Sequence, residues 1–206
     1  FILLISVFIE LKPFPANGWA LDVYESAHSG IASMIAVANS AGFFFVLYKL
    51  LPLINENLLP YFTGIGVITF VASNLMGLKQ VKARRMLGYS SIAQMGLMVA
   101  ALSLIMQFSG SFDAFRSLVI IIGGLFLNHF IAKAGLFWLA GIVKKENISD
   151  WSGIRGNILL VFMFGAFIFA LIGLPPFPGF WAKWELLTKM ASNNLGVWIF
   201  PILLGS

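Results

Sequence analysis

The most constraining feature of this sequence is a series of apolar runs, each about as long as a bilayer is thick. A helix needs about 20 residues to cross the hydrocarbon, and about five runs of that size lie between charged or turn-forming residues. They are Gly30 to Leu51, Leu59 to Leu78, Leu87 to Met106, Ser117 to Val143 and Ile158 to Leu174, with partial runs from Phe1 to Leu11 and from Trp181 onward. Lipid offers no hydrogen-bond partners, so the backbone N–H and C=O groups at the edge of an open sheet would stay unpaired, whereas a helix pairs its own. The sequence therefore predicts an all-α polytopic membrane protein.

The composition supports the same fold class and excludes several functions. Hydrophobic residues make up 60% of the chain and charged residues 10%, which a soluble domain of 206 residues would expose as large apolar patches. The chain has no cysteine, so it holds no disulfide or iron–sulfur cluster, and we expect no bound cofactor or metal. The net charge of +5 comes from cations between apolar runs, which argues against nucleic acid as a partner. We treat residues 1–206 as a single transmembrane domain.

The basic residues between the runs predict the orientation. One set of alternate loops offers only Lys49 and Arg116 before the last helix. The other set carries Lys12, Lys79, Lys82, Arg84, Arg85, Lys144, Lys145 and Arg155. By the positive-inside tendency the second set faces the cytoplasm.

Lys133 is the first candidate for chemistry, because it lies well inside the run Ser117 to Val143. A charge at the centre of a membrane helix costs about 2.5–3.5 kcal/mol, so this side chain should face protein or water. His129 precedes it by four residues, which places both on one helical face and allows a proton relay between them. The alternative is a snorkelling lysine beside a core histidine, but neither end of the run is within reach.

A proline-rich segment predicts one broken helix. Three prolines between Gly173 and Gly179 cannot continue a helix, and unwound backbone at membrane depth persists only inside protein or beside a cavity. Lys183 and Glu185 follow this break. Lys183 is either a second buried cation beside the gap or an interfacial lysine between belt tryptophans, and hydropathy does not separate the two.

A third group of polar residues opens the run Leu87 to Met106. Lys82 and Arg84 precede this run, and Ser90, Ser91 and Gln94 lie within it. They could line a polar path, although such cations are more often orientation signals and such serines bond to the preceding turn. Trp19 to Glu25 forms an acidic and aromatic connector.

Four segments resemble one family, the antiporter-like subunits of respiratory complex I, Mrp-type cation/proton antiporters and membrane-bound hydrogenases. The segments run from Trp19 to Glu25 (WALDVYE), from Lys82 to Gly96 (KARRMLGYSSIAQMG), from His129 to Phe137 (HFIAKAGLF) and from Gly173 to Lys183 (GLPPFPGFWAK). The resemblance implies that the chain is the middle to C-terminal part of a subunit with about fourteen helices, built from inverted repeats of about five helices with broken helices. It also implies a proton pathway through His129, Lys133 and Lys183.

One departure from the family pattern bears on function. Ser40 stands where the family has a lysine in its first half, and a hydroxyl cannot hold and release a proton near neutral pH. Arg84 stands where the family usually has lysine, which keeps the charge but fixes its protonation.

Three functions follow as alternatives. The first is a proton-translocating subunit of a complex-I-type complex, without redox chemistry of its own, working beside other membrane subunits in a bacterial, archaeal or organellar inner membrane. The second is a subunit of an Mrp-type sodium/proton antiporter or a membrane-bound hydrogenase. The third is a structural subunit that has lost pumping, as Ser40 suggests.

Overall fold

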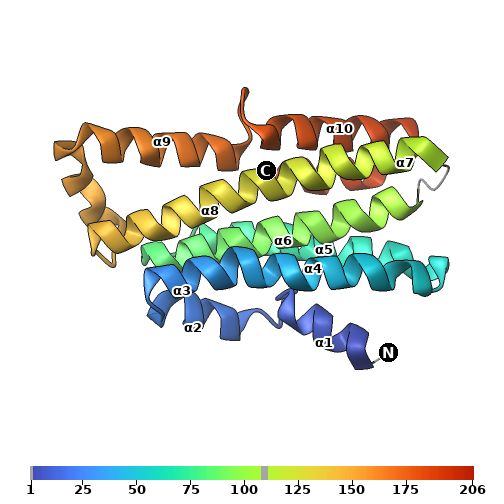
Figure 1. Cartoon of the computed structure of the whole chain (residues 1–206), viewed down its shortest axis with the longest axis horizontal. Helices are drawn as coiled ribbons and strands as arrows, with labels where there is room; N and C mark the ends of the chain where they lie inside the picture. Colours follow the sequence, from blue (N-terminus) through green and yellow to red (C-terminus); the bar gives the residue numbers. More distant parts are fainter. Residues whose placement is uncertain (1, 108–110) are drawn as a thin grey trace.

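The computed structural model describes the backbone of residues 2–107 and 111–206, and most of this backbone is helical (Figure 1). The helices lie side by side along the long axis of the molecule and run alternately in opposite directions. Within the described residues, four helical segments are long and apolar enough to cross a membrane. This arrangement confirms the predicted all-α polytopic membrane fold.

The four long segments correspond to four of the predicted spans. The first comprises α3 (Ser29–Met34), the π-helical turn η1 (Ile35–Asn39), α4 (Ser40–Leu50) and the short 3-10 turn η2 (Leu51–Leu53). The second and third are η3 (Glu56–Leu58) with α5 (Leu59–Gly77), and α6 (Ala83–Gln107). The fourth runs from Phe115, within α7 (Ser111–Leu118), through a second π-helical turn η4 (Val119–Gly123) and α8 (Gly124–Val143).

The predicted proline break is present between α9 (Ile158–Ile172) and α10 (Pro178–Ser192), which follow the 3-10 segment η5 (Ile148–Gly156). Gly173 ends α9 with a φ of 83°, a left-handed conformation that only glycine adopts without strain, and Pro178 opens α10 at its first turn. The two helices follow one another along one side of the bundle (Figure 1). The fifth predicted span is therefore the first half of a discontinuous helix, since α9 has only 15 residues.

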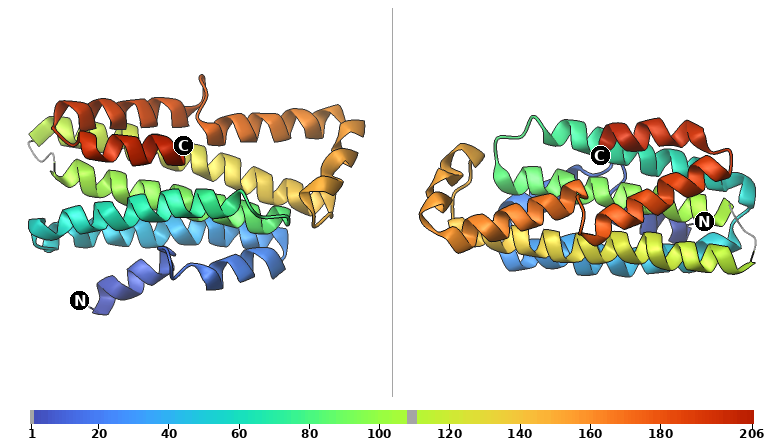
Figure 2. Two further views of the ribbon diagram at one scale, coloured as in Figure 1. Left: turned by 180° about the vertical axis from the view of Figure 1, so that it is seen from behind. Right: turned by 90° about the horizontal axis from the view of Figure 1, so that it is seen from above.

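A second break, which the sequence did not predict, separates α1 (Ile2–Glu10) from α2 (Gly18–Ser26). The segment that we expected to be a connector, Trp19 to Glu25, lies in α2. The break has the same physical cause as the other one, because Pro13 and Pro15 cannot donate backbone hydrogen bonds. The two discontinuous helices flank the bundle on opposite sides (Figures 1 and 2), and Phe1 lies outside the described residues.

The expected final run from Trp181 consists of two helices rather than one. α10 ends at Ser192, and Asn194 has a left-handed φ of 58°, which asparagine tolerates better than most residues. The 3-10 turn η6 (Gly196–Trp198) and α11 (Ile199–Gly205) follow. α11 lies against α5, where the side-chain amide of Asn74 donates to the Gly205 carbonyl at 2.7 Å.

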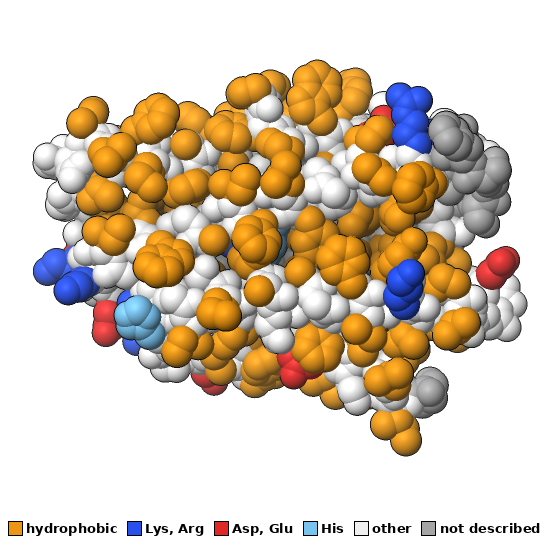
Figure 3. All heavy atoms as spheres, viewed as in Figure 1, with side chains coloured by type: hydrophobic (Ala, Val, Ile, Leu, Met, Phe, Trp, Pro, Cys, Tyr) orange, Lys and Arg blue, Asp and Glu red, His pale blue; other side chains and the backbone are white. Residues whose placement is uncertain are grey.

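Helix α6 forms the centre of the bundle and is buried along most of its length. It packs closely on α5 because small residues meet: a Cβ added at Gly66 would lie 2.6 Å from the Ala100 nitrogen, and one at Gly96 would lie 2.7 Å from the Gly66 oxygen. Close approach through small residues is the usual way in which membrane helices associate. The outer faces carry large apolar side chains, and charges gather mainly toward the ends (Figure 3).

Candidate functional site

Lys133 is fully buried on α8, in the middle of the bundle. α8 forms because its residues are apolar apart from a few polar positions, and its outer face exposes Phe130 and Trp138, as expected for lipid contact. The Lys133 ammonium points inward and donates to the backbone carbonyl of Leu87 on α6, with a separation of 3.4 Å. The structure thus places this lysine away from lipid, where an ionisable group is a candidate functional residue.

His129 lies one turn before Lys133 and is also buried. Its Nε2 atom lies 3.2 Å from the Ala36 carbonyl oxygen. A carbonyl can only accept, so this contact assigns the imidazole proton to Nε2 and leaves Nδ1 as an acceptor. Nδ1 has no hydrogen-bond partner among the described residues. The neutral ring can therefore take a proton on one side and release one on the other.

The π-helical turn η1 supplies the carbonyl that His129 contacts. A π turn shifts the backbone hydrogen-bond register, and such turns are common at functional sites. The Ala36 carbonyl also accepts from Ser91 Oγ of α6 at 3.4 Å, and the Ile35 carbonyl accepts from Ser40 Oγ at 3.0 Å. Polar groups from α4, α6 and α8 thus converge on η1, among them Ser40 and Ser91 of the sequence-based candidates.

Lys12 is a site residue that the sequence reasoning missed. We counted it among loop cations that set orientation, and this is wrong, because Lys12 is fully buried in the break between α1 and α2. Its ammonium donates to Ser40 Oγ at 2.7 Å, and its backbone is left-handed with a φ of 61°. The signal was available, because Pro13-Phe14-Pro15 beside Lys12 repeats the Pro-Phe-Pro of the second break.

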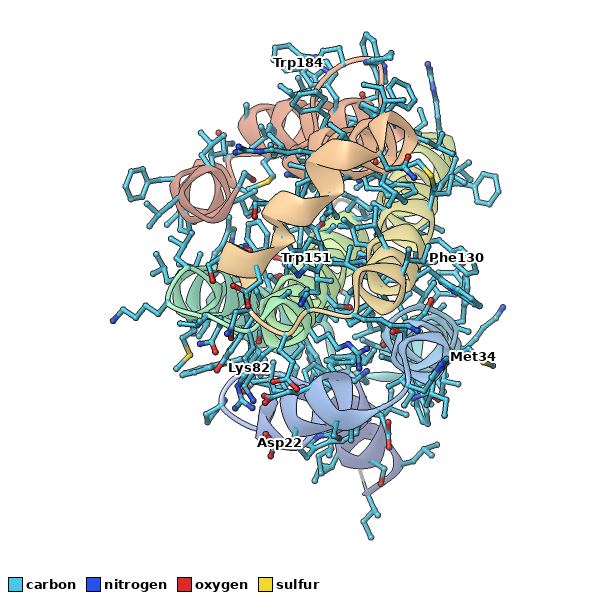
Figure 4. All side chains as sticks on the ribbon, turned by 90° about the vertical axis from the view of Figure 1, so that its left-hand side faces the viewer. Asp22, Met34, Lys82, Phe130, Trp151 and Trp184 are labelled. Atoms are coloured by element: carbon cyan, nitrogen blue, oxygen red, sulfur yellow. The ribbon has the colours of Figure 1, made fainter. Side chains whose placement is uncertain are left out.

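Lys183 lies half-buried at the second break, and whether it is a buried cation or an interfacial lysine remains a prediction. Its ammonium is 3.4 Å from the Ile172 carbonyl and lies against Gly173, so it caps the end of α9. Trp181 and Trp184 are exposed, and Trp184 marks the outer edge of α10 in Figure 4. Glu185 follows, half-buried, on the same helix. Among the described residues, no hydrogen bond joins Lys183 to Lys133.

Asn128 connects α8 to the second break, a role that no sequence signal indicated. Its side-chain amide donates to the Ala170 carbonyl of α9 at 2.8 Å, and its Oδ1 has no partner among the described residues. A Cβ at Gly179 would lie 2.7 Å from this amide. Asn128 and Lys183 therefore both bind carbonyls of the last turn of α9.

The basic residues at the start of α6 fix the end of the bundle where α2 and α3 meet. Arg84 donates to the Ala27 carbonyl at 3.0 Å and to Ser29 Oγ at 3.1 Å. Lys82 forms an ion pair with Glu25, close to Asp22 in Figure 4, and this hydrogen bond raises the pKa of Lys82 above its ordinary value. Lys82 thus stays charged near neutral pH, which suits a fixed partner better than a proton carrier.

The remaining candidates lie along α6. Gln94 is buried and Ser90 is half-buried. In the part of the chain that the structure describes, no group of three His, Asp or Glu side chains is placed to hold a metal ion. The roles predicted for the individual residues remain predictions.

Discontinuous helices around buried ionisable side chains define a class of protein, the polytopic membrane proteins built like ion and solute transporters. Within that class, the chain belongs to the family described as NADH:quinone oxidoreductase/Mrp antiporter, TM, which matches residues 1–206. This membership confirms the resemblance drawn from the four motifs.

Among curated relatives, NADH-quinone oxidoreductase subunit N of Desulforudis audaxviator is 30% identical over 211 residues, covering 95% of this chain and 39% of the relative. Subunit N 2 of Thermodesulfovibrio yellowstonii is 30% identical over 209 residues, covering 100% of this chain and 44% of the relative. The chain thus spans less than half the length of these relatives.

Two solved structures share the fold. Respiratory complex I from Thermus thermophilus with bound aureothin matches with a TM-score of 0.79 at 24% identity, covering 98% of this chain and 44% of that one. The Mrp complex from Dietzia sp. DQ12-45-1b matches with a TM-score of 0.85 at 19% identity, covering 98% and 38%. At these identities the likeness concerns the fold alone.

Proposed function

We propose that the chain forms part of a proton-translocating, antiporter-like membrane subunit of a complex-I-type respiratory complex. The observation that carries the proposal is Lys133, a lysine buried in the bundle one turn from a buried histidine with a free ring nitrogen. The names of the relatives, NADH-quinone oxidoreductase subunit N, supply the parent complex. The chain itself would perform no redox chemistry, and neighbouring membrane subunits would be its partners.

The proposed mechanism is electrostatic. A charge change in a neighbouring subunit alters the free energy of the Lys133 ammonium, because interactions between charges are strong where water is excluded. Lys133 then exchanges a proton with His129 on the same face of α8, and a second transfer leads toward Lys183 at the break. The gap in the helix is where water can reach the path.

The same residues favour protons over sodium as the transported ion. Na⁺ is a hard cation that needs several oxygen ligands, and carboxylates are the strongest of them. The buried groups around η1 are two amines, one imidazole and hydroxyls, namely Lys12, Lys133, His129, Ser40 and Ser91, while the carboxylate of Glu10 accepts from Asn39 of η1 at 3.5 Å on its exposed side. A site that contains two lysines repels a cation, whereas an amine and an imidazole carry protons.

The test uses the full-length subunit in its complex, reconstituted in liposomes. Lys133→Met removes the amine and keeps most of the packing, and we expect the pH gradient formed per electron transferred to fall about tenfold or more. Lys145→Met, which removes an exposed lysine beyond α8, should pump normally. Normal pumping by an assembled Lys133→Met complex would make the chain a structural subunit.

A further inference from the structure

Ser40 stands where the family pattern has a lysine. At this position the site therefore has no amine between Lys12 and His129. Lys12 reaches Ser40 from one side, while His129 contacts η1 from the other side. Among the described residues, no hydrogen bond joins Lys12 or Ser40 directly to His129. A proton could pass between these groups only through something that both donates and accepts hydrogen bonds.

Tyr24 of α2 lies between these groups. Its side chain is fully buried, with its ring against α6, where a Cβ added at Gly88 would lie 2.7 Å from Tyr24 Cδ2. The ring also contacts Phe137 of α8, with the centroids 5.5 Å apart. Its hydroxyl lies near the hydroxyls of Ser40 and Ser91. Tyr24 thus joins a residue beside Lys12 to a residue beside His129.

Ser91 completes the connection. Its hydroxyl and the Nε2 atom of His129 both point at the same acceptor, the Ala36 carbonyl, at 3.4 Å and 3.2 Å. Two donors that share one acceptor are neighbours, and a movement of the His129 ring and the Ser91 side chain toward each other would let Ser91 Oγ accept from His129 Nε2. The groups then follow one another in the order His129, Ser91, Tyr24, Ser40 and Lys12.

We propose that the hydroxyls of Tyr24, Ser40 and Ser91 carry protons between His129 and Lys12, across the position where the family pattern has a lysine. This inference rests on the proposed function. A protonated His129 gives its Nε2 proton to Ser91 Oγ as the Ser91 proton moves to Tyr24 and the Tyr24 proton to Ser40. The Ser40 proton then binds the neutral amine of Lys12. Every hydroxyl regains a proton, and imidazolium plus amine become imidazole plus ammonium.

A packing role for Tyr24 is the alternative, because the ring fills space against Gly88 and Phe137. Tyr24→Phe separates the two roles, since it keeps the ring and removes only the hydroxyl. Tyr89→Phe is the matched control, because it removes one hydroxyl from another buried tyrosine one residue beyond Gly88. Ser40→Ala and Ser40→Thr form a second pair, in which only threonine keeps a hydroxyl.

The experiment measures the number of protons pumped per electron by the full-length complex in liposomes that hold equal amounts of assembled complex. Lys133→Met is measured in the same series as these variants. We expect Tyr24→Phe and Ser40→Ala to lose about tenfold or more, with Tyr89→Phe and Ser40→Thr near the unmodified level. Normal pumping in Tyr24→Phe while Lys133→Met is impaired would overturn the hydroxyl path and leave the proposed function intact. Normal pumping in Lys133→Met would overturn both.

Discussion

Lys12 combines a buried charge with a strained backbone at one position. Its ammonium is fully buried, and its φ of 61° is a left-handed conformation that is unfavourable for a residue with a Cβ. Such strain costs about 1–3 kcal/mol and persists where the surrounding structure holds it in place, often at functional sites. Together with the 2.7 Å hydrogen bond to Ser40, these costs argue that the cation is kept for a purpose.

Replacing Lys12 by Met should therefore impair pumping. Methionine keeps most of the side-chain volume and removes only the amine, so we expect the subunit to assemble and the protons pumped per electron to fall about tenfold or more. The measurement is the same liposome assay, with Lys49→Met as a control because Lys49 is an exposed cation at the end of α4. Unchanged pumping by Lys12→Met would show that Lys12 only fills the break.

The residues of the site were predictable where they lie inside a long apolar run. Lys133 and His129 could be identified because their run leaves no room for snorkelling and their spacing matches one helical turn. Lys12 could not be identified by hydropathy, since a lysine at the edge of a short run is indistinguishable from a loop cation. Asn128 and Tyr24 were missed for another reason, because their roles depend on partners far away in the sequence.

The helices themselves were largely predictable, whereas their interruptions were less so. The four long spans follow from hydropathy, and the break before Pro178 follows from proline chemistry. The break beside Lys12 was missed although Pro-Phe-Pro occurs at both breaks. The π turns η1 and η4 carry no sequence signature, because apart from Asn39 and Gly123 their residues are apolar ones that also occur throughout the other spans. Yet η1 organises the polar site.

The contact between α8 and α10 offers a test of the second break as a unit. A Cβ at Gly179 would strike the Asn128 amide at 2.7 Å, while a Cβ at Gly124 would strike the Ala182 Cβ at 2.9 Å. Both substitutions to alanine crowd the same helix pair and should destabilise it by about 1–3 kcal/mol. Only Gly179→Ala displaces Asn128 from the Ala170 carbonyl and so disturbs the turn that Lys183 caps.

We therefore expect Gly179→Ala to pump less than Gly124→Ala at equal assembly, by roughly threefold or more if the break positions a proton carrier. Thermal unfolding of the two complexes, measured in parallel, checks that both suffer a similar loss of stability. Equal pumping by the two variants would mean that the contact serves packing alone.

Among the described residues, three lysines inside the bundle extend from one discontinuous helix to the other: Lys12 and Lys133 are fully buried, and Lys183 is half-buried. Lys12 lies in the first break, Lys133 in the central helices and Lys183 in the second break, on opposite sides of the bundle (Figures 1 and 2). Tyr24 and the hydroxyls around η1 lie between the first two. If this series is one path, interrupting it at two places is no worse than interrupting it at one.

Lys12→Met and Lys133→Met in one chain make that argument testable. If the residues form a single path, we expect the double variant to pump about as few protons per electron as the single variant that pumps less. Residues that act as a unit give strongly non-additive losses. For two independent paths the double variant should lose the sum of what the single variants lose, so each single variant would retain a large part of the pumping. The measurement is the number of protons pumped per electron by the unmodified subunit, the two single variants and the double variant. Each is compared in liposomes that hold equal amounts of assembled complex and have a low passive ion leak. Additive partial losses would contradict a continuous path through Tyr24.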